Sequence, residues 1–169
     1  EGNITSNAQL VQGLVASVSV EPDLPADKFA QLAQYLFKGR SQLRNIGAAP
    51  DLIIKYMYPL EGNEAAIGLN FRNHPKQLQA VLQARDNKSL LFDGPVDLVQ
   101  GGQGFIARIP VFLDRQQSGE GNVFWGVISA VIDVDQLYQA SGLLALAEEF
   151  DIALRRNGGP ENGKVFFGT

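Results

Sequence analysis

The stretch that decides the fold is LLFDGPVDLVQGGQGFIARIPV, residues 90–111, in which two apolar runs flank a glycine-rich segment. Neither run has helical spacing, and each carries a proline, Pro95 or Pro110. The glycines within residues 101–104 allow the positive φ that a tight reversal requires. The pattern therefore predicts a β-hairpin whose prolines lie at a bulge or a sheet edge, where a ladder hydrogen bond is missing.

The same glycines resemble a cofactor loop, because Gly102, Gly104 and Ala107 fit a loose form of the dinucleotide-binding fingerprint. That fingerprint requires a helix to begin directly after it, so that the helix N-terminus holds the pyrophosphate. Here a strand is expected instead, and no phosphate-loop lysine is present. The context favours a hairpin over nucleotide binding.

The composition is that of a globular chain long enough for one domain with a core. The 169 residues are 45% hydrophobic and 19% charged, without the bias of a disordered chain. A net charge of -4 and no cluster of Lys and Arg argue against nucleic acid as a partner. The absence of cysteine excludes disulfides, thiolate catalysis and zinc ribbons, and fits a bacterial cytoplasm or periplasm.

The apolar runs are shorter than the ~20 residues that span a bilayer. The chain begins at Glu1 without a methionine or a signal peptide. We therefore expect a fragment of a longer protein.

Two amphipathic helices are predicted before any strand. The first spans residues 4–20, with an apolar stripe from Leu10 to Val18 at helical spacing. Pro25 and Asp27 open the second, which we expect to continue through residue 46. The stripe of the first helix packs either on a following sheet or on its copy in a second subunit.

Five strands follow, interrupted by a helix at residues 75–87. The predicted strands are residues 52–58, 65–71, the two arms of the 90–111 hairpin, and 124–132. Asp133 and Gln136 form a capping-box pattern before a further helix, and a hairpin around residues 157–159 ends the chain. Short connections between consecutive strands predict an antiparallel sheet with helices beside it, which is an α+β fold.

These residues resemble a known family. Residues 58–112, from YPLEGNEAAIGLNFRNHPKQ to GPVDLVQGGQGFIARIPVF, and residues 124–137, FWGVISAVIDVDQL, are similar to the CHASE domain. CHASE domains are extracytoplasmic sensory domains of bacterial receptor kinases, diguanylate cyclases and phosphodiesterases, and of plant cytokinin receptors. The resemblance covers nearly the whole chain from about residue 29 to residue 168.

The resemblance implies a PAS-like five-stranded sheet without catalysis of its own and without a cofactor. On this basis we divide the chain into stalk helices at 1–48, a sensory core at 49–136, and a membrane-proximal helix and hairpin at 137–169. It also implies a homodimer through the N-terminal helix, and a parent protein of the bacterial inner membrane with a transmembrane helix on each side. A GGDEF or EAL domain, or a histidine kinase, is the expected cytoplasmic output, and the domain itself is expected in the periplasm.

A PAS-like sheet binds small molecules between one face and the segments that cover it, so polar groups that interrupt apolar strands are the candidates. Arg108 is the foremost candidate, because its guanidinium lies within FIARIPVF and can present a bidentate fork to a ligand carboxylate. The alternatives are that Arg108 faces solvent or pairs with Asp93 or Asp97.

Further ligand-binding candidates come from the resemblance and from aromatic residues in strands. Asn70 lies where cytokinin receptors carry an aspartate that holds the ligand; the amide removes that charge but keeps a donor and an acceptor. Phe92 matches a position whose backbone contacts the ligand. The candidate aromatic walls, which are equally compatible with plain core positions, are Tyr56, Tyr58, Phe105 and Trp125.

Catalytic and metal chemistry have little support. His74 is the only histidine and precedes a proline at an expected helix start, so we interpret it as a surface residue and predict no metal site. The sequence predicts an extracytoplasmic sensor of an unidentified small molecule. The alternatives are a stand-alone periplasmic solute-binding protein and, less favoured, a small hydrolase.

Overall fold

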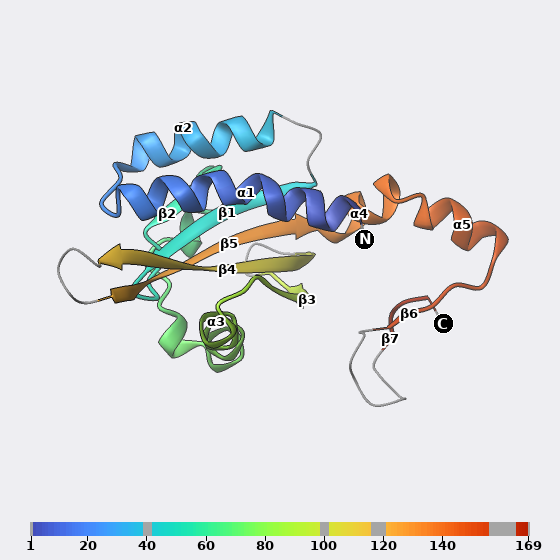
Figure 1. Cartoon of the computed structure of the whole chain (residues 1–169). Coiled ribbons are helices and arrows are strands. Elements are labelled where there is room, and N and C mark those ends of the chain that lie inside the picture. Colours follow the sequence, from blue (N-terminus) through green and yellow to red (C-terminus); the bar gives the residue numbers. More distant parts are fainter. Residues whose placement is uncertain (1, 39–41, 99–101, 116–120, 156–164, 169) are drawn as a thin grey trace. The chain divides into compact units, whose positions relative to one another are not determined.

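The hairpin predicted at residues 90–111 forms one edge of a five-stranded antiparallel sheet in the computed structural model of the chain (Figure 1). The structure describes residues 2–38, 42–98, 102–115, 121–155 and 165–168. The strands lie in the order β2-β1-β5-β4-β3. Their bounds are β1 Leu43–Pro50, β2 Tyr56–Tyr58, β3 Leu91–Asp97, β4 Gln103–Arg115 and β5 Gly121–Asp133.

Both prolines of the hairpin lie where the prediction places them. Pro95 is on the edge strand β3, at a register shift between Asp93 and Val96. Pro110 is on β4 beyond the last residue that pairs with β3, which is Arg108, so its missing N–H leaves no ladder position empty on that side. The glycine reversal at residues 99–101 and the loop at 116–120 are outside the described residues.

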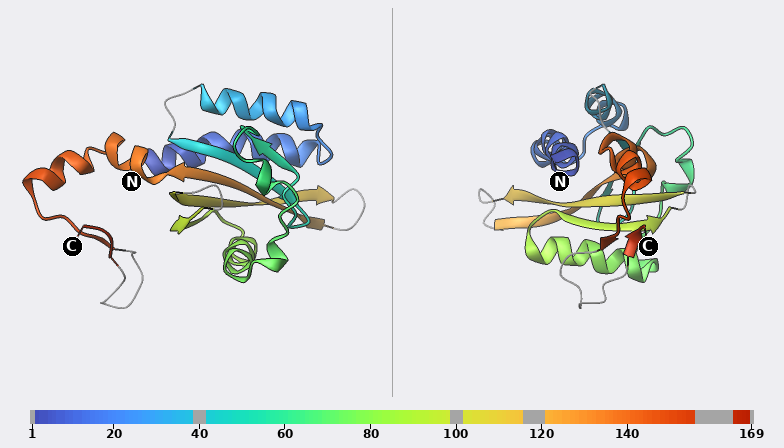
Figure 2. Two further views of the ribbon diagram at one scale, coloured as in Figure 1. Left: turned by 180° about the vertical axis from the view of Figure 1, so that it is seen from behind. Right: turned by 90° about the vertical axis from the view of Figure 1, so that its right-hand side faces the viewer.

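Helices cover the two faces of the sheet (Figures 1 and 2). Helices α1, Gly2–Val20, and α2, Ala26–Phe37, lie on one face, and α3, Pro75–Asn87, lies on the other. The α1 stripe is buried against β4 and β5 through Val11, Leu14 and Val18. This supports the intrachain packing that we considered for the stripe, and the homodimer stays a prediction.

Two sequence predictions are wrong. Residues 43–50 form strand β1 rather than the end of the second helix, and this strand pairs with both β2 and β5. Residues 65–71 are not a strand. They run from the 3-10 helix η1, Glu64–Ala66, through a turn with Gly68 at φ 82°, to the 3-10 helix η2, Phe71–Asn73. Of the strand expected at 52–58, only β2 and an isolated bridge between Ile53 and Asn70 form.

The chain divides into two compact units, residues 1–133 and 134–169. The sheet and helices α1 to α3 belong to the first unit. The second contains α4 Val134–Ala140, α5 Leu143–Glu149, and a hairpin of β6 Leu154–Arg155 and β7 Val165–Phe167. Within it, the rings of Tyr138 and Phe167 pack edge to face with centroids 4.7 Å apart. The turn predicted at residues 157–159 lies outside the described residues.

The α+β fold with a PAS-like sheet is therefore confirmed. None of the described helices is both long enough and apolar enough to cross a lipid bilayer.

Candidate functional site

Arg108 lies in the middle of β4, on the face of the sheet that α3 covers. Its register partners are Leu91 on β3 and Ser129 on β5, so the side chain is flanked by strands on both sides. Alternation along a strand places its neighbours Ala107 and Ile109 on the opposite face, where α1 lies. With 1% of its surface exposed, Arg108 is the largest of the fully buried side chains in the described part of the chain.

The guanidinium of Arg108 is held by neutral groups from three different elements. Nη1 donates to the hydroxyl oxygen of Ser129 at 3.0 Å, and Nη2 donates to the side-chain carbonyl of Gln77 on α3 at 3.2 Å. The ring of Phe71 on η2 lies 5.1 Å from the guanidinium carbon, a cation–π distance. Nε is buried and has no hydrogen-bond partner among the described residues.

Burial dominates the electrostatics of this side chain. Desolvation lowers the pKa of the Arg108 guanidinium from its ordinary value to about 10, against an opposing attraction from Asp93. A pKa of about 10 keeps Arg108 positively charged at neutral pH. A buried charge stabilised mainly by neutral groups is unfavourable for the folded state, because the solvation lost on burial is incompletely replaced.

The residues around Arg108 are positioned by a braced connection that runs into α3. Asn70 caps η2, because its side-chain oxygen accepts from the backbone N–H of Arg72 at 3.0 Å. Arg72 in turn donates to the backbone oxygen and to the carboxylate of Asp51, each at 2.7 Å. Pro75 then begins α3, since a proline at N1 loses no helical hydrogen bond. Phe71 and Gln77 are thereby held over β4 and β5.

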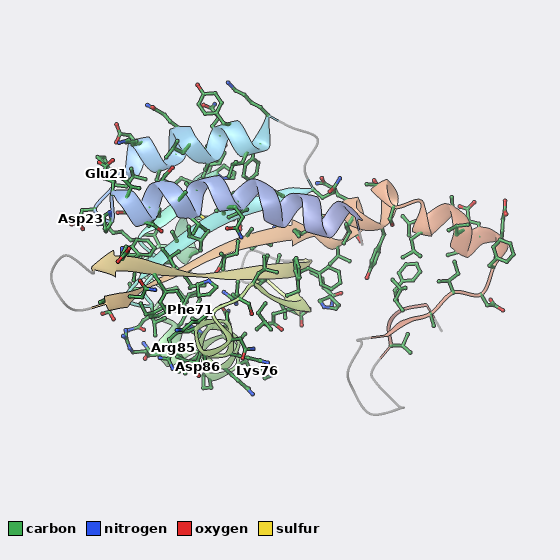
Figure 3. The ribbon with its side chains drawn as sticks, in the orientation of Figure 1. Glu21, Asp23, Phe71, Lys76, Arg85 and Asp86 are labelled. Carbon is green, nitrogen blue, oxygen red and sulfur yellow. The ribbon has the colours of Figure 1, made fainter. Side chains whose placement is uncertain are left out.

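An apolar cluster lies beside the guanidinium. Figure 3 shows Phe71 on the α3 side of the sheet, whereas Glu21 and Asp23 lie on the other side, at the connection between α1 and α2. Phe71 is 1% exposed and belongs both to this cluster and to the surroundings of Arg108. The buried members are Ala49, Leu52, Ile54, Ala66, Phe71, Val81 and Val127.

The structure does not bring all the predicted ligand-binding residues together. Tyr56 and Tyr58 point to the opposite face, where Tyr56 stacks on Phe29 at 5.0 Å and Tyr58 packs edge-on against Phe37 at 5.1 Å. Both partners belong to α2, so the two tyrosines fasten that helix to the sheet. Both lie apart from Arg108: Tyr56 is a buried core residue, the alternative that we had considered, and Tyr58 is half-buried.

Phe92 and Phe105 also lie on the face opposite Arg108. Phe92 pairs with Ala107, the residue next to Arg108 on β4, and Phe105 lies three residues before Arg108 on the same strand. Because successive side chains of a strand point to opposite faces, both phenylalanines face away from Arg108. Phe92 is 38% exposed on the edge strand.

The remaining two candidates are Trp125 and Asn70. Trp125 is the extra residue at a register shift between β4 and β5, and its backbone oxygen accepts from the N–H of Asp51 at 2.9 Å. Asn70 acts as the cap described above. Its side chain supports the segment that carries Phe71, which gives it a positioning role in the structure.

Sequence reasoning missed Ser129, Gln77 and Phe71. Ser129 had a usable signal, because it is the one hydroxyl residue in the apolar run GVISAVI, as Arg108 is the one charge in FIARIPVF. Gln77 and Phe71 had none. A glutamine in the first turns of a helix and a phenylalanine after an expected strand are ordinary, and only the packing of α3 brings them to Arg108.

No group of three or more metal-ligating side chains comes together in the described residues. The arrangement at Arg108 has hydrogen-bond donors and a positive charge, with no nucleophile and base in contact among the residues that touch the guanidinium. Its donors and positive charge are suited to binding an acceptor group.

The chain is an α+β domain with a PAS-like sheet and a buried cation beneath its covering helix. A sequence model of the CHASE domain matches residues 3–167, nearly the whole chain. The chain therefore belongs to the CHASE domain family, and it is an extracytoplasmic sensor domain. No curated protein sequence matches it.

Among solved structures, an extracellular ligand binding receptor from Desulfohalobium retbaense DSM5692 is similar. The TM-score is 0.73 at 15% sequence identity, over 99% of this chain and 28% of that protein. At this identity the likeness shows the shared fold.

Proposed function

We propose that this chain is the small-molecule sensor of a transmembrane signalling protein, and that the ligand binds on the α3 side of the sheet at Arg108. The observation that supports this most is the buried guanidinium whose Nε has no partner in the described residues. A charge kept under these conditions is unfavourable for folding, which points to a role in binding. The structurally similar protein from Desulfohalobium retbaense is an extracellular ligand binding receptor, which agrees with this role.

Strand β4 offers a direct route from the ligand to the N-terminal helix. One face of β4 presents Arg108, and the other presents Ala107 and Ile109, buried where β4 contacts α1. Because Arg108 is buried, a ligand reaches it only when the layer of η2 and α3 moves. Binding therefore favours one arrangement of that layer and of β4, and α1 senses the change. The signal requires that the ligand bind the two arrangements with different affinity.

The finer assignment is that of a periplasmic domain between two membrane spans of a bacterial inner-membrane protein. A homodimer through α1 would carry a small helix displacement to an output domain, a cyclic-di-GMP enzyme or a histidine kinase. The second candidate is a stand-alone periplasmic solute-binding protein. The two differ in the gene: the receptor requires an apolar segment of about 20 residues on each side of this chain, and the solute-binding protein requires only a cleavable signal peptide.

The binding site is tested by a thermal-shift screen of amino acids, carboxylates, purines and polyamines against the parent chain. A specific ligand raises the melting temperature by mass action, in a concentration-dependent way. We expect the shift to vanish in Arg108→Gln. It should persist in the control Arg85→Gln, which removes an arginine of α3 that pairs with Asp86 at 2.8 Å on the surface. A ligand whose shift is the same in the Arg108 variant would place the site elsewhere.

A further inference from the structure

We propose that the ligand is a small organic monocarboxylate, whose carboxylate binds the Arg108 guanidinium together with Ser129 and Gln77. This deepens the proposed function and rests on it, because it assigns a chemical class to the ligand of that same site.

The groups around Arg108 offer more hydrogen-bond donors than acceptors. A guanidinium has five N–H donors and no acceptor, so Ser129 and Gln77 must both present an oxygen to it. Their own donors, the hydroxyl proton and the amide NH₂, are then left to bind something else. Nε–H of Arg108 adds a further donor at the same place, and it has no acceptor among the described residues. A carboxylate, which only accepts, is complementary to this set.

The positive charge of Arg108 favours a negatively charged ligand. Arg108 stays protonated at neutral pH, and its two hydrogen-bonded partners are neutral. A neutral ligand would satisfy Nε–H but would leave the buried charge offset only by the attraction of Asp93. A carboxylate does both, through parallel N–H···O bonds from Nε and one Nη, the bidentate geometry that arginine favours.

Asp93 limits the ligand to one negative charge. Asp93 pairs with Ile106, two residues before Arg108, so the Asp93 side chain lies on the same face of the sheet. Its negative charge acts on the guanidinium. A second anionic group on the ligand would be repelled by Asp93, so dicarboxylates and phosphate are disfavoured. Phe71 and its apolar cluster border the site and suit a short apolar tail.

The test compares carboxylates with their neutral amides, which have nearly the same shape. The unsubstituted 169-residue chain is titrated with propionate, isobutyrate, propionamide, isobutyramide, succinate and phosphate. The buffer contains no carboxylate or phosphate of its own, and the ionic strength is held constant. Isothermal titration and the shift of the Arg108 Nε–H resonance in ¹⁵N NMR report binding. We expect each monocarboxylate to bind at least 10-fold more tightly than its amide and than succinate, and to move the Nε–H resonance.

Substitutions test whether the carboxylate binds at Arg108. Arg108→Gln should abolish carboxylate binding, Ser129→Ala should weaken it about 10-fold, and the control Arg85→Gln should leave it unchanged. Ser129→Ala removes a single hydroxyl from a site that keeps its charge, so it remains informative if Arg108→Gln does not fold. Circular dichroism of each variant checks folding.

The outcomes separate this inference from the proposed function. Amides that bind as tightly as carboxylates would overturn the inference, as would carboxylate binding that Ser129→Ala and Arg108→Gln leave unchanged. A neutral or cationic ligand that requires Arg108, with no carboxylate binding, would overturn the inference and leave the proposed function in place. If no compound of any class in the wider screen binds in an Arg108-dependent way, the proposed site itself fails.

Discussion

At the scale of single residues, Arg108 is retained at the expense of stability. Its charge is buried against neutral partners and one ring, and a buried charge of this kind replaced by an apolar side chain of similar length is often neutral or stabilising. In the proposed function, ligand binding rather than folding accounts for this residue.

We therefore expect Arg108→Met to unfold in urea with a free energy of unfolding within about 1 kcal/mol of the parent, or higher by up to about 2 kcal/mol. Ser129 and Gln77 each lose a hydrogen bond from a charged donor in this variant, which offsets part of the gain. Equilibrium unfolding followed by circular dichroism measures the difference. A loss above about 3 kcal/mol would instead show that the guanidinium is a structural element of the core.

Tyr138 gives a residue-scale prediction in the second unit. Its hydroxyl is buried without a partner among the described residues, and burial, with a contribution from Asp135, raises the pKa of Tyr138 above 10. Above pH 10 the unfolded chain loses this proton while the folded unit keeps it, so the unfolded state binds fewer protons and stability falls as pH rises.

We expect Tyr138→Phe to reduce this loss of stability above pH 10. At pH 7 its stability should equal or exceed that of the unsubstituted chain, because no hydrogen bond is removed and a buried hydroxyl without a partner is unfavourable. Thermal unfolding between pH 7 and pH 11 measures both. The same decline with pH in the parent and the variant would contradict the prediction.

At the scale of elements, the close approach of β1 to β5 depends on Gly126. This residue has φ 153°, and a Cβ atom there would lie 2.1 Å from the backbone oxygen of Ala49. Because the obstacle is backbone, no side-chain rearrangement relieves it. The strain therefore falls on the pairing of the two central strands.

We expect Gly126→Ala to lower the free energy of unfolding by about 3 kcal/mol or more. The matched control is Gly13→Ala on α1, where nothing lies within 4 Å of the added atom; alanine there should stabilise by about 0.5–1 kcal/mol through helix propensity. Both values come from urea unfolding. An equal effect of the two substitutions would refute the assignment of β1 beside β5 at this point.

The elements also show where sequence patterns fail. Strand β1 was predicted as helix because Leu43 and Ile46 are three residues apart and continue the preceding helical spacing. In the fold this strand lies between β2 and β5 and is buried along most of its length, so tertiary pairing overrides local periodicity. The opposite error occurred at residues 65–71, where Gly68 and the cap at Asn70 turn an apolar run into 3-10 helices.

At the scale of the whole molecule, the first unit contains the entire five-stranded sheet. It also contains Ser129 and Gln77, which hydrogen-bond to Arg108. In the second unit, α4 buries Val134, Leu137 and Tyr138, whereas α5 buries none of its side chains. Because the sheet and the contacts of Arg108 lie in residues 1–133, we expect ligand binding and most of the stability to reside there.

A chain truncated after Asp133 is expected to unfold in one cooperative transition and to keep the Arg108-dependent ligand affinity within about 3-fold. Thermal unfolding followed by circular dichroism and the titrations described above measure these properties, with the 169-residue chain as the control. A non-cooperative transition, or loss of the binding, would show that the second unit is required.

The sequence by itself determined the α+β class, the hairpin with its two prolines, α1 to α3, and Arg108 as the unusual residue of β4. These follow from local physics: hydrophobic period, proline chemistry and a lone charge in an apolar strand are readable without knowing what lies nearby. Only the tertiary structure decided which residues share a face with Arg108. It placed Ser129, Gln77 and Phe71 there, and it turned Tyr56, Tyr58, Phe92 and Phe105 to the other side. The reason is that strand register sets the facing of every side chain, and a shift of one residue reverses it.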